Sequence, residues 1–330
     1  MFHTEKTLRM FSALAAFAGL VGCAGASDAA PVGTSSDALS NAIPKQEWIA
    51  IDLGAQSGAA SVSTKNVAVR TIGAAPVCES ATPAQFAALS HQIASSANGT
   101  VAGLMSMVGQ ITSQPPVART DDHAVWGPIT SPTAPAVYRF EVDRVDATLF
   151  AFRLLGRPKD GDESTWRGVF EGQVAPVDDA HRKGDAHVDF TAAHTLDPSN
   201  GPTAGALALH FEASNDARTI ALTFAGVTGP GAPAPNDAVY TYTQPNDGAG
   251  TFDFVTHADF DDDGKQDELL HVQSRWDAVS GGQAVVSIVG ASLPHPVVAT
   301  ECWNATGGAV FYADDASMHP PVGAADCCPK

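Results

Sequence analysis

The sequence predicts a mainly β fold of the α+β class: a large antiparallel sheet, curled into a barrel or half-barrel, with two N-terminal helices packed on it. The 30 Gly and 22 Pro among 330 residues favour short elements joined by turns. Short apolar segments recur after residue 117, separated by turn-rich pieces too short for parallel crossovers. A β-sandwich is the alternative fold. The absence of a strict internal repeat argues against a propeller or solenoid.

Two helices are expected between residues 82 and 114. Thr82-Pro83 is a typical N-cap and first-turn pair, and apolar residues at helical spacing extend the first helix to about Ala97. Asn98-Gly99 is expected to interrupt it, and Pro115-Pro116 ends the second helix. The apolar stripe of the second helix consists of Val101, Leu104, Met105, Val108 and Ile111. We interpret this stripe as core packing rather than a ligand site.

The clearest strand covers residues 138–143, where large apolar residues alternate with charged ones. This period of two places one face in the core and the other in water. Further strands are expected over residues 149–155, 166–174, 187–192, 207–213, 220–224, 239–243, 252–257, 269–276, 283–289, 297–302 and 309–312.

The first residues predict export. Lys6 and Arg9 precede an apolar run over residues 10–20, which is too short to span a bilayer. The following Leu20-Val21-Gly22-Cys23 resembles the lipobox of bacterial lipoproteins, which implies cleavage before Cys23 and lipidation of its thiol. Ala24, where an Asp would favour the inner membrane, implies an outer-membrane protein that faces the periplasm or the cell exterior.

These features predict the domain organisation. Residues 1–22 are a signal peptide, and residues 23–45, which are small and polar, are a flexible tether. Residues 46–330 are expected to form a single folded body. Its first part, residues 46–116, holds a strand and the helices, and residues 117–330 hold the antiparallel strands.

The cysteines are typical of an oxidising compartment. Besides Cys23, the chain contains Cys78, Cys302, Cys327 and Cys328, an even number. A bond between the adjacent Cys327 and Cys328 would be strained, so each is expected to pair with Cys78 or Cys302. Which pairs with which stays open. A long loop closed in this way would stabilise the fold by about 4 to 5 kcal/mol.

One acidic stretch indicates ion chemistry. Residues 259–267 (DFDDDGKQD) fit the pattern D-x-D-x-D-G-x-x-D, in which alternate carboxylates converge on a hard cation such as calcium. Leu270 stands where an EF-hand has its bidentate Glu, but the stretch resembles the calcium loop of FG-GAP and VCBS repeats. That resemblance implies five metal ligands: Asp259, Asp261, Asp263 and Asp267, with the carbonyl of Lys265. A solvated acidic hairpin turn without metal is the alternative.

Charge and motifs limit the function classes. With Lys+Arg 18 against Asp+Glu 36, the formal charge of −18 disfavours nucleic acid as a partner. The common hydrolase, nucleotide and redox motifs are absent, so no enzymatic activity is expected. His187 with Asp189, and His123 after Asp121-Asp122, are interpreted as solvated polar faces.

The lipobox, the spacer and the segments Ser274-Arg275-Trp276 and Glu301-Cys302-Trp303 together resemble a group of uncharacterised bacterial envelope lipoproteins. Two functions are therefore expected as alternatives. One is a non-catalytic binding or structural module, anchored to the membrane by lipid, that holds an apolar ligand. The other is a calcium-dependent adhesion or partner-binding module on the cell surface.

Overall fold

A computed structural model describes residues 38–51, 53, 78, 82–176, 181–199, 201–229, 234–259, 265–277, 279–290, 293, 295–317 and 319–329. The protein is mainly β, as predicted: fifteen strands form one antiparallel sheet in the order of the chain. The order begins at β1 and ends at β15, so the sheet is not closed into a barrel. The β-sandwich alternative would require two sheets, whereas these strands form one.

The chain divides into two compact units, which we describe separately. Unit 1 consists of the described residues of Asp52–Ser95 and Val239–Lys330. Unit 2 consists of those of Phe11–Ile51 and Ser96–Ala238. The range in which a flexible tether was expected ends in ordered structure, because α2 (Ala38–Asn41) begins there and Leu39 is buried.

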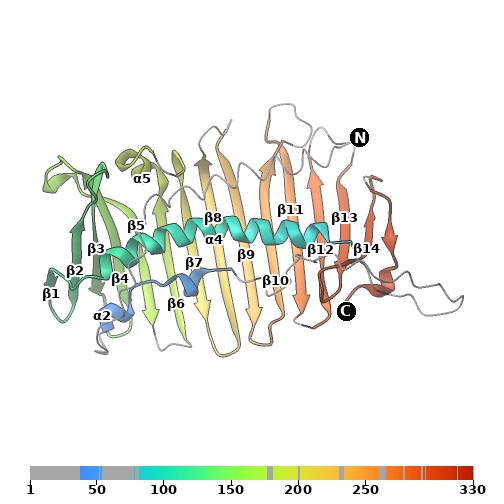
Figure 1. The fold of residues 1–330 in the computed structure, drawn as a ribbon, viewed down its shortest axis with the longest axis horizontal. Helices are drawn as coiled ribbons and strands as arrows, with labels where there is room; N and C mark the ends of the chain where they lie inside the picture. The colour runs from blue at the N-terminus through green and yellow to red at the C-terminus, as the bar shows by residue number, and fades with distance from the viewer. Residues whose placement is uncertain are drawn as a thin grey trace, which may run out of the picture. The chain divides into compact units, whose positions relative to one another are not determined.

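Unit 2 contains the first eight strands and three short helical elements besides part of α4 (Figure 1). The strands are β1 (Ala118–Arg119), β2 (His123–Ile129), β3 (Ala136–Arg144), β4 (Phe150–Pro158), β5 (Arg167–Pro176), β6 (Arg182–Asp189), β7 (Ala204–Ala213) and β8 (Ala217–Thr228). The helices are α2, α3 (Gln46–Ile49) and α5 (Phe190–Leu196), with a 3-10 turn, η2, over Glu163–Thr165. A ladder of stacked or tilted rings, Phe140, Phe152 and Phe170, runs across β3, β4 and β5 inside the core.

One strand predicted in unit 2 was wrong in its second half. Residues 187–192 were expected to be extended, but β6 ends at Asp189 and α5 begins at Phe190. The Asp189 carboxylate accepts a hydrogen bond from the backbone N–H of Ala192 at 2.8 Å. This N-cap satisfies an otherwise unpaired helical donor and starts the helix.

Unit 1 contains the remaining strands, the first of which begins at the boundary between the units. They are β9 (Asn236–Pro245), β10 (Gly250–Ala258), β11 (Glu268–Asp277), β12 (Gly281–Val289), β13 (Val297–Trp303), β14 (Ala309–Asp314) and β15 (Val322–Gly323), followed by a 3-10 turn, η3, over Ala325–Cys327. Tyr240 packs on Phe254 with ring centroids 4.7 Å apart, and Trp303 packs with Ala84 and Ala284 in a second cluster.

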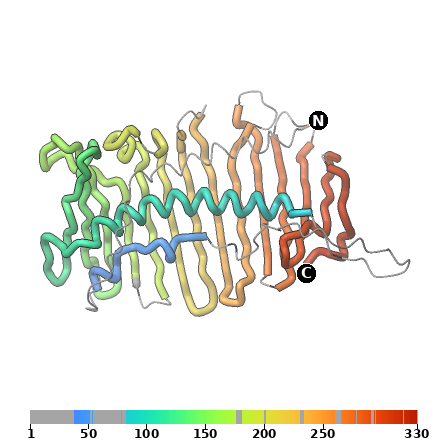
Figure 2. Tube along the Cα trace, in the orientation of Figure 1, coloured from blue at the N-terminus to red at the C-terminus, as the bar shows by residue number. Residues whose placement is uncertain are grey.

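The two predicted helices are one continuous helix, α4 (Gln85–Thr112), as Figure 2 shows. The expected break at Asn98-Gly99 was wrong. The Asn98 side chain accepts from the backbone N–H of Ile51 at 2.6 Å and donates to its carbonyl at 2.7 Å. Its polar groups are therefore satisfied outside the helix and do not compete with the helical backbone. The cost of Gly99, about 1 kcal/mol, is outweighed by packing of the helix.

Both disulfides lie in unit 1. Cys78 is bonded to Cys327 and Cys302 to Cys328, so each member of the adjacent pair has a distant partner, as predicted. The structure also resolves the pairing that the sequence left open. The first bond joins residues separated by 249 positions and fixes the carboxyl-terminal segment to the start of the unit.

Candidate functional site: an apolar cavity in unit 2

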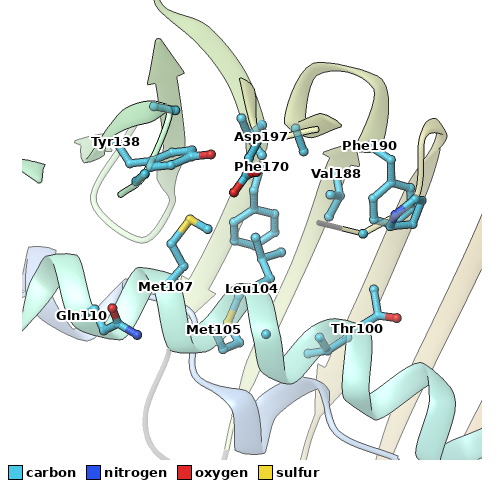
Figure 3. A pocket seen from close by; sticks show the side chains of 18 of the residues that line it. Thr100, Leu104, Met105, Met107, Gln110, Tyr138, Phe170, Val188, Phe190 and Asp197 are labelled. Carbon is cyan, nitrogen blue, oxygen red and sulfur yellow. The ribbon is translucent and has the colours of Figure 1, made fainter. Parts of the chain in front are cut away.

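Unit 2 contains a cavity of about 650 Å³ between the second half of α4 and the inner face of its strands (Figure 3). Residues from α4, β3, β5, β6, α5 and β7 contribute to the wall. Ile49 of α3, Ile129 of β2, the loop between β2 and β3 and the segment between α5 and β7 complete it. Cavities of roughly 300 to 1,000 Å³ are the size in which proteins hold small molecules.

Most of the wall is apolar. Leu104, Met105 and Met107 project from α4, and the facing side chains include Phe170 and Val188 (Figure 3). Methionine side chains are flexible and polarisable, so they adapt to apolar guests of different shape. The stripe interpreted as core packing is indeed buried, but three of its members, Val101, Leu104 and Met105, also line this cavity.

The main polar groups at one side of the cavity are Tyr138 and Asp197. The Tyr138 hydroxyl points toward the side where Asp197 lies (Figure 3). Burial, and secondly the charge of Asp197, raises the pKa of Tyr138 to about 12. The phenol, neutral at physiological pH like an ordinary tyrosine, therefore stays protonated to a higher pH here. Asp197 Oδ1 accepts hydrogen bonds from the backbone N–H of Ser199 at 3.1 Å and from its hydroxyl at 2.5 Å.

A glycine positions the Tyr138 ring. A Cβ atom at Gly156 would lie 2.5 Å from Leu196 Cδ1 and 2.8 Å from Tyr138 Cε1. The absence of a side chain lets the ring and Leu196 of α5 pack closely over this point of β4, and a larger residue would displace them. Gly156 therefore sets both the place of the phenol and that of the helix leading to Asp197.

The loop between β2 and β3 forms one rim of the cavity. The ammonium group of Lys159 donates to the carbonyl oxygens of Ser131 and Pro132, each at 3.1 Å. The Thr130 hydroxyl donates to the carbonyl of Ala136 at 2.9 Å. These bonds hold the loop beside the cavity, while Lys159 itself is not one of the wall residues.

The opposite side is held by the segment before α4. Asn98 binds both backbone groups of Ile51, as described above, and the Arg218 guanidinium donates to the carbonyl of Ala50. Trp48 packs on Phe211 with ring centroids 6.1 Å apart. This segment carries Ile49 into the wall.

The predicted lipidation and metal sites fall largely outside the described residues. Cys23 lies there, as do Asp261 and Asp263 of the acidic loop. Asp259, Lys265 and Asp267 are described, and the pairing of Ala258 with Glu268 places them in the connection between β10 and β11. Among the described residues, no group of three or more potential ligands could hold a metal ion.

The histidines and carboxylates that were interpreted as solvated polar faces have the following surroundings. His187 is exposed on β6, whereas Asp189 caps α5. His123 contacts Asp143 across the strands at 2.6 Å, not the neighbouring Asp121-Asp122. His187 and His123 thus lie on strands, and Asp189 is a helix cap.

Sequence reasoning missed Tyr138 and Asp197 as members of one site. Tyr138 was assigned to a strand face and Asp197 was not singled out. They lie 59 positions apart in the chain and meet only because β3 and the end of α5 border the same space. A clearer signal was available in Gly156, because glycine inside an alternating strand often marks a close approach of another group.

No protein-family model, curated protein or solved structure matches this chain. Among the helices that the structure describes, none combines the length and apolar character needed to cross a bilayer.

Proposed function

We propose that this protein is a lipid-anchored envelope protein with a non-catalytic module that holds an apolar ligand in the cavity of unit 2. The cavity itself carries the proposal: about 650 Å³ with a mostly apolar wall, in which polar side chains such as Tyr138, Asp197 and Gln110 are interspersed. Such a site binds by desolvation and uses its polar groups to orient the ligand. In this proposal the strands of unit 2 form one wall of the binding site, and α4 forms the wall that faces them.

The anchor is proposed from the sequence around Cys23. Acyl chains on this residue would each contribute about 0.8 kcal/mol per buried CH₂, enough for stable attachment to the outer membrane when several are present. Mass spectrometry of protein from its native host tests this. We expect a fatty-acylated Cys23 as the first residue, and loss of acylation in Cys23→Ser. An intact, unmodified amino terminus would contradict the anchor.

The ligand is tested by extracting lipid from the purified protein. Met107 lines the cavity and is half-buried, whereas its neighbour Ser106 is exposed on the same helix. In Met107→Trp the indole occupies ligand volume, so we expect little co-purified lipid. Ser106→Trp is the matched control and should retain the wild-type amount. Equal lipid in both variants, or none in the wild type, would contradict the proposal.

A calcium-dependent adhesion module is the second candidate, favoured by one observation. The acidic loop connects two antiparallel strands, β10 and β11, which is the placement that its resemblance to FG-GAP and VCBS loops implies. Calcium titration followed by calorimetry tests it, with Asp259→Asn as the variant. Saturable binding lost in that variant, together with calcium-dependent attachment to cells, would support this function. Heat effects identical with and without the substitution would exclude it.

A further inference from the structure

The charges around the cavity indicate what its ligand carries at the polar end. The described wall residues include no Lys, Arg or His, and Asp197 is the charged one among them. A carboxylate or phosphate bound there would lose its water without gaining a cation, which is costly. It would also be repelled by Asp197.

The Tyr138 hydroxyl differs from the Asp197 carboxylate in the hydrogen bonds that it can make. Tyr138 is protonated at physiological pH, as a phenol ordinarily is, and its hydroxyl points toward the side where Asp197 lies (Figure 3). A neutral phenol can both donate to and accept from a hydroxyl or amine. A carboxylate accepts only, so a ligand group that donates hydrogen bonds suits the pair.

Lys159, which is bonded to the rim loop, does not change this balance. Lys159 is committed to the carbonyl oxygens of Ser131 and Pro132 on the rim loop. It therefore braces the loop instead of presenting its charge as part of the wall. The formal charge of −18 on the whole chain adds a field that repels anions in general.

We infer that the cavity selects an amphiphile whose head group donates hydrogen bonds and carries no negative charge, such as a long-chain alcohol or amine. The inference rests on the proposed function, because it concerns the ligand of the same cavity. Tyr138 and Asp197 would hold the head group, and the side chains of α4 and the strands would surround the tail.

Calorimetric titration with decylamine, decanol and decanoate tests the selection, because the three share one tail and differ in the head. We expect decylamine and decanol to bind at least about tenfold more tightly than decanoate, a difference of about 1.4 kcal/mol. Asp197→Asn should reduce the preference for decylamine over decanoate. Asp216→Asn removes an exposed carboxylate of the same unit and should leave the preference unchanged.

The outcomes separate the two proposals. Equal affinity for decanoate and the other ligands would overturn the selection and leave the apolar cavity function intact. A preference that falls equally in Asp197→Asn and Asp216→Asn would also overturn it, because general charge would then explain the result. Failure of all three ligands to bind would overturn both proposals.

Discussion

The two compact units differ in how α4 is held against the strands. In unit 1 its start is fixed by polar contacts: the buried Glu301 carboxylate accepts from the backbone N–H groups of Gln85 and Phe86, and Ser90 bonds to Ser274 at 2.5 Å. In unit 2 the second half of α4 faces the strands across a cavity with mostly apolar walls. One helix is thus fixed by buried polar contacts at its start and borders an apolar cavity further along.

The disulfides are expected to give the largest effect. Removing the Cys78–Cys327 bond with the double substitution Cys78→Ser and Cys327→Ser should lower the free energy of unfolding by about 5 kcal/mol, because a very long loop is released. The Cys302–Cys328 bond closes a much shorter loop, so its removal should cost about 3 kcal/mol. Denaturant titration gives both values. Equal costs, or a larger cost for the short loop, would show that chain entropy does not govern this unit.

Glu301 is expected to give the next largest effect, in unit 1. The side chain is 3% exposed, and Glu301→Gln replaces one acceptor oxygen with a donor facing backbone N–H groups. An unsatisfied buried N–H costs about 1 to 3 kcal/mol, which denaturant titration should detect. Asp326→Asn, at an exposed carboxylate of the same unit, should have no measurable effect. A neutral result for Glu301→Gln would show that the cap does not hold the start of α4.

The pKa of Glu301 adds a pH dependence. Burial, opposed by backbone hydrogen bonds, raises its pKa above the usual 4.5. The folded protein thus holds this proton more tightly, and the resulting stability is present below pH 4.5 and lost as the pH rises through the folded pKa. The wild type should therefore lose stability relative to Glu301→Gln over this range. A pH-independent difference would contradict the assigned direction.

Tyr138 supplies the corresponding measurement in unit 2. Its pKa is raised from 10.0 to about 12, so its contribution to stability is present below pH 10 and lost between about pH 10 and 12. The wild type should lose roughly 2 to 3 kcal/mol more than Tyr138→Phe over that window. Alkaline denaturation of both proteins checks this, since the other tyrosines are common to the two. If the two proteins lose stability in parallel between pH 10 and 12, the Tyr138 hydroxyl is solvated and its pKa is not raised.

Gly99 is expected to give the smallest effect. An added Cβ would meet nothing within 4 Å, and the residue lies inside α4. Gly99→Ala should therefore raise the free energy of unfolding by about 0.5 to 1 kcal/mol through helix propensity and a less flexible unfolded chain. Thermal unfolding measures the change. Destabilisation would mean that α4 needs a flexible position next to Asn98.

Features of the fold that depend on local sequence could be predicted, whereas those that depend on contacts between distant residues could not. Alternation of apolar and charged residues is local, so strands such as residues 138–143 were predicted close to their observed positions. The continuity of α4 at Asn98 depends on Ile51, 47 positions earlier, and could not be recognised locally. The cavity depends on helices, strands and loops from distant parts of the chain meeting around one space. No single segment of the sequence indicates that such a cavity forms.

The most direct test of the central claim is a fluorescence titration with N-phenylnaphthylamine, whose emission rises in apolar surroundings. We predict saturable binding to the wild type and to Ser106→Trp, and affinity weakened at least about tenfold in Met107→Trp, because the indole takes up part of the cavity between α4 and the strands. Equal affinity in all three proteins would place the probe elsewhere and contradict a ligand site in unit 2.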